Sequence, residues 1–444
     1  MLLRYLRGLV PLLLCALLGA CAFIDDWFGK ADAPPLPGKR IAVLTDDNAL
    51  QVDRSIANLP VRLPDPYVND TWSQPGGNAV HALYHLSLGA EPEVDWTADV
   101  GSGSSDDSQI LAEPLVIGDT VYTMDSRSVV TAFEAESGKR RWRVDLADDA
   151  EDDGFFGGGI AFGDGKVFVS TGFAQVFAVD AGSGEVLWSQ PVPGPMRAAP
   201  TFSDGRVFAI SVDNQLHALD AGTGAALWSH TGIQEVATLL GGSSPAVKGS
   251  TVIAPYSSGE LFALLAENGR VLWSDLLASV RRIDPIADMA DIRGLPVIDR
   301  GLVLAASNAG RMIAIDLRRG ERAWDIDLSS VQTPWVGGDF VYVVSADAKL
   351  VCLTRANGAV RWVLPLQQYE DEEGRFDPIS WRGPVLAGGR LVLAGSHGEG
   401  VWVSPQSGEV LSEFDLPGGA AVTPVVAGQT VYFLTDGGTL VAMR

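Results

Sequence analysis

The sequence predicts an all-β fold, an eight-bladed β-propeller built from four-stranded antiparallel blades. A motif recurs six times in which a tryptophan follows a turn glycine by four residues. The six tryptophans are Trp142, Trp188, Trp228, Trp273, Trp324 and Trp362. Consecutive tryptophans are 38 to 51 residues apart, a period typical of four-stranded propeller blades. A solenoid or two stacked sandwiches would also use repeats of this kind.

Within one repeat, turn residues separate four short segments that can each form a strand. In the repeat that closes on Trp228, these segments are residues 197–202, 207–211, 216–220 and 226–230. Asp204-Gly205, between the first two segments, is a hairpin signal. Leu216 and Ala218 point to one face of the third strand while Leu219 points to the other. Because both faces are apolar, we expect each blade to stack on two neighbours.

The two ends of the repeat region set the number of blades at eight. The last repeat stops after its third strand, around Thr439–Ala442. Trp96 lies 46 residues before Trp142, in register with the other tryptophans, but has no strands of its own before it. We therefore expect the strand around Trp96 to pair as the outer strand of the last blade, which closes the ring and removes an open seam. One position departs from the motif, because Ser412 follows Gly408 where a tryptophan is expected.

The first twenty residues have the features of an export signal. Arg4 and Arg7 precede an apolar stretch of about ten residues, which is too short to span a bilayer. It ends in Leu18-Gly19-Ala20-Cys21, an order that resembles the bacterial lipobox. The resemblance implies that residues 1–20 are removed and that Cys21 is acylated. An ordinary secretory signal with a chance cysteine is the alternative. Residue 22 is alanine rather than aspartate, which favours sorting to the outer membrane.

Residues 21–90 differ in composition from the repeats that follow. A proline cluster, Pro34-Pro35-Leu36-Pro37, is followed by further prolines up to Pro75. Proline removes a hydrogen-bond donor and restricts φ, so we expect a lipidated, extended tether with little regular structure. The propeller is predicted to occupy residues 91–444.

Cysteine content and charge restrict the compartment and the partners. Loss of Cys15 with the signal and acylation of Cys21 leave Cys352 alone, so we expect no intramolecular disulfide and a buried packing role for this residue. The chain has 55 acidic and 32 basic residues, for a net charge of −23. This charge argues against binding to nucleic acid, whose phosphates it would repel, and it permits a basic protein partner.

The repeats resemble those of pyrroloquinoline-quinone propellers. The pattern Ala-x-Asp-x-x-Thr-Gly-x-x-x-Trp is matched in full from Ala218 to Trp228, and from Ala178 to Trp188 with Ser183 in place of threonine. These residue types serve the packing of blades, because the tryptophan covers apolar area and the glycine turn permits close approach. The repeat is therefore a structural signal and does not show that a quinone is bound.

Taken together, the lipobox, the proline-rich tether and the eight repeats resemble the BamB family, lipoproteins of the outer-membrane β-barrel assembly machine. Four further segments carry the likeness, Asp152–Phe155, Ser243–Ala246, Tyr256–Leu261 and Gln332–Trp335. The resemblance implies a scaffold without catalytic activity or cofactor, lipid-anchored on the periplasmic face of the outer membrane. It also implies three kinds of partner: the POTRA domains of BamA, other lipoproteins of the machine, and unfolded outer-membrane proteins.

Two connections between blades contain the candidate partner-binding residues. The connection after Trp273 is long and mixes charged with apolar residues, which suits a protein interface. The resemblance implies contacts with BamA here and in the preceding connection. The candidates are Leu239, Leu240, Arg281, Arg282, Ile283, Asp284, Asp288 and Asp291. Gly241 departs from the family, which commonly has an arginine there. The alternative is that both connections only pack on neighbouring blades.

Two other classes of function remain open at this point. A quinone-dependent dehydrogenase usually has a calcium site, a catalytic aspartate and often an adjacent cysteine pair, and no such pair is possible here. The five histidines show no metal-ligand spacing, and no nucleophile or phosphate-binding motif is present. Asparagines and acidic residues could still gather in the central channel. A lipoprotein that binds polysaccharide or another envelope component is the second class, and Trp335, Trp381 and Trp402 lie outside the repeat pattern.

Overall fold

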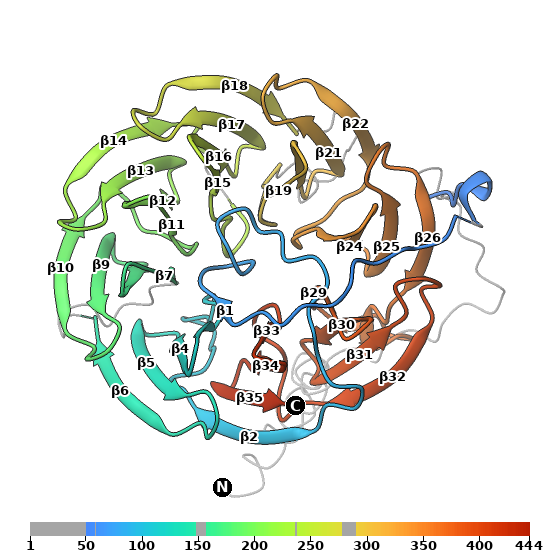
Figure 1. The fold of residues 1–444 in the computed structure, drawn as a ribbon, viewed down its shortest axis with the longest axis horizontal. Helices are drawn as coiled ribbons and strands as arrows, with labels where there is room; N and C mark the ends of the chain where they lie inside the picture. Colours follow the sequence, from blue (N-terminus) through green and yellow to red (C-terminus); the bar gives the residue numbers. More distant parts are fainter. Residues whose placement is uncertain (1–49, 58, 148–156, 236–237, 278–289) are drawn as a thin grey trace, which may run out of the picture. The chain divides into compact units, whose positions relative to one another are not determined.

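Eight β-sheets surround a central axis in the computed structural model of the protein (Figure 1). The structure describes residues 50–57, 59–147, 157–235, 238–277 and 290–444. Within these residues each of the eight sheets is a blade with four antiparallel strands, to which a short fifth strand (Thr71–Trp72) is added in the first blade, and we number the blades in chain order. The predicted eight-bladed propeller is therefore confirmed.

The first four blades follow one another along the chain. Their strands are, for blade 1, β3 (Leu115–Ile117), β4 (Thr120–Met124), β5 (Val129–Glu134) and β6 (Arg140–Asp145); for blade 2, β7 (Gly159–Gly163), β8 (Lys166–Ser170), β9 (Gln175–Asp180) and β10 (Val186–Pro191); for blade 3, β11 (Thr201–Ser203), β12 (Arg206–Ser211), β13 (Gln215–Asp220) and β14 (Ala226–Thr231); and for blade 4, β15 (Ala246–Lys248), β16 (Thr251–Pro255), β17 (Glu260–Leu265) and β18 (Val271–Leu276).

The remaining blades repeat this order, and a two-stranded hairpin is inserted before blade 7. Their strands are, for blade 5, β19 (Val297–Asp299), β20 (Leu302–Ala306), β21 (Arg311–Asp316) and β22 (Arg322–Asp327); for blade 6, β23 (Trp335–Gly337), β24 (Phe340–Val344), β25 (Lys349–Thr354) and β26 (Val360–Pro365); for the hairpin, β27 (Tyr369–Asp371) and β28 (Phe376–Pro378); for blade 7, β29 (Trp381–Ala387), β30 (Arg390–Gly395), β31 (Glu399–Val403) and β32 (Val410–Asp415); and for blade 8, β33 (Val425–Ala427), β34 (Thr430–Leu434), β35 (Thr439–Met443) and β2 (Val94–Asp99).

The ring closes as predicted, because blade 8 is shared by the two ends of the repeat region. Strand β2 pairs antiparallel with β35, which places Trp96 opposite Ala442. The backbones of Glu93 and Arg444 exchange two further hydrogen bonds, of 2.8 and 2.9 Å. Pairing of the ends removes the open seam that a ring would otherwise have between its first and last blades.

Blade 3 agrees with its predicted strands except at its inner edge. The turn at Asp204 and Gly205 has positive φ at both residues, 47° and 71°, as a two-residue hairpin requires. The inner strand β11 begins at Thr201 rather than at residue 197. Pro200 lacks the N–H that a ladder needs, so residues 197–200 belong to the connection that leads into the blade.

Each repeat tryptophan joins its blade to the next one. The Trp228 indole N–H donates to the carbonyl of Ala266 at 3.0 Å, and a Cβ at Gly269 would lie 2.5 Å from the Trp228 ring. Gly269 also has φ +72°, so both its backbone and its neighbour exclude a side chain. The same bond, between 2.8 and 3.2 Å long, is made by Trp96, Trp142, Trp188, Trp273, Trp324 and Trp362.

The exception at Ser412 also has a structural reason. Ser412 lies on β32, the outer strand of blade 7, and therefore faces blade 8. The third and outer strands of blade 8 come from opposite ends of the chain, so no glycine turn joins them. A tryptophan at position 412 would have no glycine turn to cover.

The core lies in the layers between blades. Leu216 and Ala218 belong to one apolar cluster with residues of blade 4, whereas Leu219 packs in another cluster with residues of blade 2. The two predicted faces of this strand are therefore buried on different sides of the blade. Cys352 is fully buried in a third cluster, opposite Trp362, and burial raises the pKa of its thiol.

The structure corrects the described part of the predicted tether, residues 50–90. Residues 1–49, which include the predicted signal and Cys21, lie outside the described residues. Residues 50–90, in contrast, belong to the same compact unit as the blades. They contain a three-residue 3-10 turn, η1 (Arg54–Ile56), and strand β1 (Thr71–Trp72), which pairs with β3. The described residues contain no other helical segment, and none of them forms a membrane-spanning helix.

Residues 69–88, which we call the axial segment, cross one end of the ring near its centre (Figure 1). Hydrogen bonds join the axial segment to all eight blades, at Gly118, Phe162, Phe202, Val247, Ile298, Trp335, Gly388 and Gly428. The prolines of this region predicted an extended tether with little regular structure. Here the irregular segment supplies seven backbone carbonyls and the Gln74 side-chain oxygen to N–H groups of the blades, which would otherwise be unpaired.

Candidate functional site

The connections between blades lie at the end of the ring opposite the axial segment. Antiparallel strands alternate in direction, so the turns after the first and third strands of a blade lie at one end and the inter-blade connections at the other. The axial segment bonds to the first of these ends, for example at Gly118 and Gly388. The opposite end, which we call the connection rim, contains Leu239, Leu240 and Asp291 of the predicted partner-binding residues.

The structure brings together the two connections that were predicted to form the site. Leu239 and Leu240 lie in the connection between β14 and β15, and Asp291 lies in the connection between β18 and β19. The backbone N–H of Leu239 donates to the Asp291 carboxylate at 2.9 Å. The other predicted residues, Arg281, Arg282, Ile283, Asp284 and Asp288, lie outside the described residues.

Asp291 lies inside the protein, where it contributes to the packing of the two connections, and is not exposed to a partner. Its side chain is buried, and burial raises its pKa to about 6. The hydrogen bond from Leu239 and the charges of Arg293 and Arg197 act in the opposite direction and favour the carboxylate. Asp291 therefore holds one connection against the other, which agrees for this residue with the alternative of packing on neighbouring blades.

Arg293 lies in the same connection as Asp291 but was not among the predicted partner-binding residues. A Cβ at Gly241 would lie 2.9 Å from the Arg293 Nε atom, so the guanidinium of Arg293 packs directly on this glycine. The resemblance had suggested an arginine at position 241 itself. The structure places a guanidinium beside that position from the next connection, a contact that no local pattern in the sequence indicates.

Exposed apolar side chains lie on the connection rim near these residues. Ile233 is 59% exposed, Leu240 is 37% exposed, and Leu276 at the end of β18 is 49% exposed. The Ile233 N–H donates to Glu260, and Glu260 is paired opposite Leu276 in blade 4. Apolar anchors with charged neighbours are typical of surfaces that bind other proteins.

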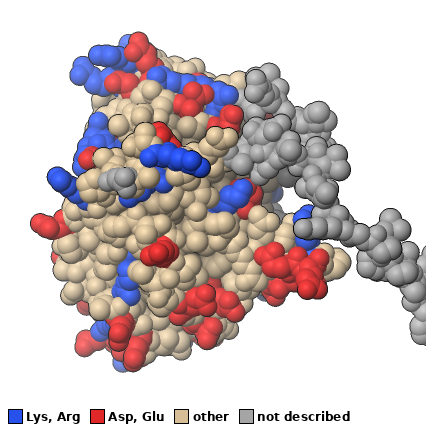
Figure 2. Space-filling view, turned by 90° about the vertical axis from the view of Figure 1, so that its right-hand side faces the viewer, with Lys and Arg blue, Asp and Glu red and all other residues tan. Residues whose placement is uncertain are grey.

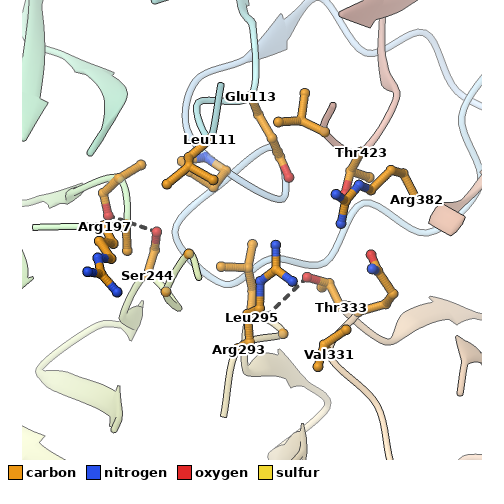
Figure 3. A pocket seen from close by; sticks show the side chains of 18 of the residues that line it. Leu111, Glu113, Arg197, Ser244, Arg293, Leu295, Val331, Thr333, Arg382 and Thr423 are labelled. Carbon is orange, nitrogen blue, oxygen red and sulfur yellow. Dashed lines mark hydrogen bonds between the residues drawn. The ribbon is translucent and has the colours of Figure 1, made fainter. Parts of the chain in front are cut away.

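A cavity of about 660 Å³, open solvent at its mouth included, lies on the ring axis beside this rim. Its lining comes from the connections that enter the blades, and Pro75 of the axial segment also contributes. Figure 3 shows Glu113, Arg197, Arg293 and Arg382 around the same space. Sequence reasoning did not find this group, because its members are separated by 84 to 96 residues along the chain and have no shared motif.

Glu113 is the acidic member of the cavity lining. Its Oε2 atom accepts a hydrogen bond of 3.0 Å from the N–H of Gly76, which ties the axial segment to the cavity wall. Burial raises the pKa of Glu113 to about 7, although the bond from Gly76 lowers it. Its carboxyl group therefore takes up or releases a proton near neutral pH.

The tryptophans outside the repeat pattern and the described metal-ligating side chains do not form a binding site. Trp335, Trp381 and Trp402 are buried, and Trp335 stacks on Trp72 with ring centroids 6.3 Å apart. They give no exposed aromatic surface for a polysaccharide. Among the described residues, no group of three or more metal-ligating side chains is close enough to hold an ion.

Acidic side chains are spread over solvent-exposed parts of the surface. Glu370, Asp371, Glu372 and Glu373 are all exposed in and beside the β27–β28 hairpin. On the side of the molecule shown in Figure 2, most acidic side chains lie in the lower half of the view. This distribution agrees with a solvating role for most of the excess negative charge.

A family model and the curated relatives that match this chain agree on one family. The family described as outer membrane protein assembly factor BamB matches residues 126–364 and 368–444. A BamB from Salmonella typhimurium is 32% identical over 360 residues, which cover 79% of this chain and 88% of that protein.

Two solved structures are similar to the fold. The crystal structure of BamB from Moraxella catarrhalis has a TM-score of 0.67 at 20% identity, and the match covers 80% of this chain and all of that one. A quinohemoprotein alcohol dehydrogenase from Comamonas testosteroni has a TM-score of 0.65 at 14% identity, covering 88% of this chain and 82% of that one. At these identities the two structures support the fold alone.

Proposed function

The chain belongs to the BamB family of outer membrane protein assembly factors, and on this premise we propose that it is a scaffold lipoprotein of the machine that assembles outer-membrane β-barrels. In this proposal Cys21 is lipidated and holds the protein on the periplasmic face of the outer membrane. The connection rim binds the POTRA domains of BamA. Other lipoproteins of the machine and unfolded outer-membrane proteins are the further partners.

The observation that carries this proposal is the pairing of the two predicted connections on one rim. The Leu239–Asp291 hydrogen bond fixes them together, while Leu240 and Ile233 stay exposed beside them. A rigid ring closed through β2 and β35 supports the rim. A preorganised surface of this kind loses little conformational entropy when a partner binds, which suits a scaffold.

A quinone-dependent enzyme is the alternative within this fold. The dehydrogenase likeness is a likeness of fold at 14% identity and carries no argument for activity. The scaffold proposal predicts recovery of BamA when the protein is captured from an envelope extract. Quinone-dependent dye reduction by the purified protein would favour the enzyme instead.

Substitutions on the rim test the binding surface directly. We expect Leu240→Ala to weaken capture of the purified POTRA domains by about tenfold, because one exposed apolar anchor is lost. Leu411→Ala is the matched control, since Leu411 is 52% exposed on the outer strand of blade 7. Both variants should keep the melting temperature of the parent. Equal capture by the two variants would remove Leu240 from the interface.

A second pair of variants tests the part of the rim that the structure does not describe. Reversing the charges with Asp284→Lys and Asp288→Lys should weaken capture of BamA without lowering the melting temperature. Asp371→Lys with Glu373→Lys on the β27–β28 hairpin makes the same change in net charge at another exposed place. If both double variants lose capture equally, the effect is one of net charge and the proposed loop contact is wrong.

The lipid anchor has its own test. We expect Cys21→Ala to release the protein into the soluble periplasmic fraction, because two or three acyl chains supply the membrane affinity. Fractionation followed by a salt wash measures this. Retention of the variant in the washed membranes would contradict the lipidated Cys21.

A further inference from the structure

A second cavity, of about 490 Å³ with the open solvent at its mouth included, lies between blades 3 and 4. We call it the blade 3–4 cavity. Phe208 of β12 and Val247 of β15 form the apolar part of its wall, and turns of both blades surround its mouth. These are the turns after the first and third strands, so the cavity opens at the end of the ring that carries the axial segment. A Cβ at Gly249, in one of these turns, would meet no atom within 4 Å.

An aromatic ring fills the equivalent place between the two preceding pairs of blades. Phe162, Phe202 and Val247 hold the same register position in the inner strands of blades 2, 3 and 4. Phe162 stacks on Tyr122 of blade 1, with ring centroids 6.3 Å apart. Phe202 stacks on Phe168 of blade 2 at 5.4 Å. Between blades 3 and 4 the smaller Val247 takes this position, which leaves space that a ring fills elsewhere.

A segment from outside the blades fills the equivalent place between blades 6 and 7. Tyr342 and Leu386 hold there the register positions of Phe208 and Val247. Leu63, which precedes the axial segment, packs in one apolar cluster with Tyr342 and Leu386. The protein therefore already closes one such place with an apolar side chain from a segment that forms no helix or strand.

The charges around the blade 3–4 cavity favour a basic residue beside the apolar one. Asp204 and Glu267 line the cavity and are exposed. Arg206 is the one basic residue of the lining, and it donates to the backbone carbonyl of Asp204 at 3.4 Å. Lys248 and Arg270 are exposed in the neighbouring turns but do not line the cavity. The lining therefore has one more acidic than basic side chain.

We propose that the blade 3–4 cavity binds an extended segment of a partner protein, which inserts a leucine or phenylalanine side chain and places a basic residue next to it. The inserted side chain would contact Phe208 and Val247, as Leu63 contacts their counterparts between blades 6 and 7. In that segment too a basic residue, Arg62, is next to the leucine. The cavity lies at the end of the ring opposite the connection rim, so this proposal does not rest on the proposed scaffold function.

Synthetic peptides and the purified full-length protein test the cavity. The first peptide repeats residues 59–64, and the second is the same peptide with Leu63→Phe. Fluorescence anisotropy should show saturable binding of one peptide per chain. A third peptide, with Leu63→Ala, should bind at least about tenfold more weakly, because the buried apolar area is lost. Absence of saturable binding by both of the first two peptides overturns the proposal.

Val247→Phe fills the cavity with the ring that the preceding blades have at this position. We expect this variant to bind the peptides at least about tenfold more weakly than the parent, with an unchanged circular dichroism spectrum. Equal binding by Val247→Phe and the parent would overturn the proposal, because the peptide would then bind elsewhere, for example by displacing Leu63 between blades 6 and 7.

A charge variant keeps the test decisive if the larger side chain at position 247 prevents folding. Glu267→Lys leaves the apolar wall intact and should weaken peptide binding about threefold by repelling the basic residue. Glu136→Lys is the matched control, because Glu136 is exposed at the same turn position of blade 1, and it should bind like the parent. Equal binding by the two lysine variants contradicts the proposal. So does a dimer of the parent in sedimentation that Val247→Phe converts to a monomer, which would assign the cavity to a second copy of the chain.

Discussion

At the scale of single residues, Glu113 is the group whose environment differs most from what its place in the sequence suggests. It precedes Pro114 in a short stretch before β3, with no motif around it. In the folded protein its carboxyl group faces the axial cavity and accepts from Gly76. Arg197, Arg293 and Arg382 line the same cavity, yet burial is the largest influence on its pKa and raises it from 4.5 to about 7.

This pKa predicts a dependence of stability on pH. The folded protein binds the Glu113 proton more tightly than the unfolded chain does. Its favourable contribution is therefore complete below about pH 4.5 and is lost as pH rises through about 7. We expect Glu113→Gln to be more stable than the parent at pH 8, by up to about 3 kcal/mol, and closer to it at pH 5.

Urea denaturation of both proteins at several pH values measures this difference. Glu260→Gln is a suitable control, because Glu260 is a partly buried carboxylate on the connection rim that does not line the axial cavity. A difference between Glu113→Gln and the parent that stays constant from pH 5 to pH 8 would show that Glu113 does not titrate in this range.

At the scale of elements, the repeated contact between a tryptophan and the glycine turn of the next blade holds the sheets in register. Trp228 is partly buried, donates to Ala266 and covers Gly269. Gly269 has φ +72°, and the Trp228 indole occupies the space that a side chain at this position would need. The turn and the indole therefore depend on each other. The same contact at seven positions explains why this tryptophan is the strongest signal in the sequence.

Truncation of one ring tests this contact. We expect Trp228→Ala to lower the free energy of unfolding by about 3 kcal/mol, the lower end for loss of a large aromatic side chain, because the ring is partly exposed. Trp228→Phe should be intermediate, since it keeps apolar contact but loses the bond to Ala266. Leu227→Ala, at a side chain that is 46% exposed, should change stability by less than about 0.5 kcal/mol. Similar stability of the Leu227→Ala and Trp228→Ala variants would show that the Trp228 indole does not stabilise the contact between the blades.

At the scale of the whole molecule, two sets of hydrogen bonds join the eight blades into a single unit. Pairing of β2 with β35 closes the circle, and the axial segment bonds to every blade from the inside. Trp72 connects distant blades directly, because it pairs with blade 1 through β1 and stacks on Trp335 of blade 6. Its side chain is fully buried.

This arrangement predicts that one substitution on the axis loosens blades that are not neighbours. Trp72→Ala should lower the free energy of unfolding by about 3–5 kcal/mol. Hydrogen exchange should become faster in β3 and β23 together, because both lose the same support. Tyr67→Ala is the control, since Tyr67 is 41% exposed in the chain leading to the axial segment. Faster exchange confined to blade 1 would show that Trp72 does not couple the two blades.

The sequence by itself determined the eight-bladed ring, its closure by the strand around Trp96, and the contact positions of the repeat tryptophans. These features could be predicted because they recur: each blade meets the same neighbours, so one periodic pattern encodes all of them. Only the tertiary structure decided the path of the axial segment, the bond between Leu239 and Asp291, and the meeting of Glu113 with Arg293 and Arg382. Those contacts join irregular segments that are far apart along the chain, and a repeat pattern contains no information about where such segments meet.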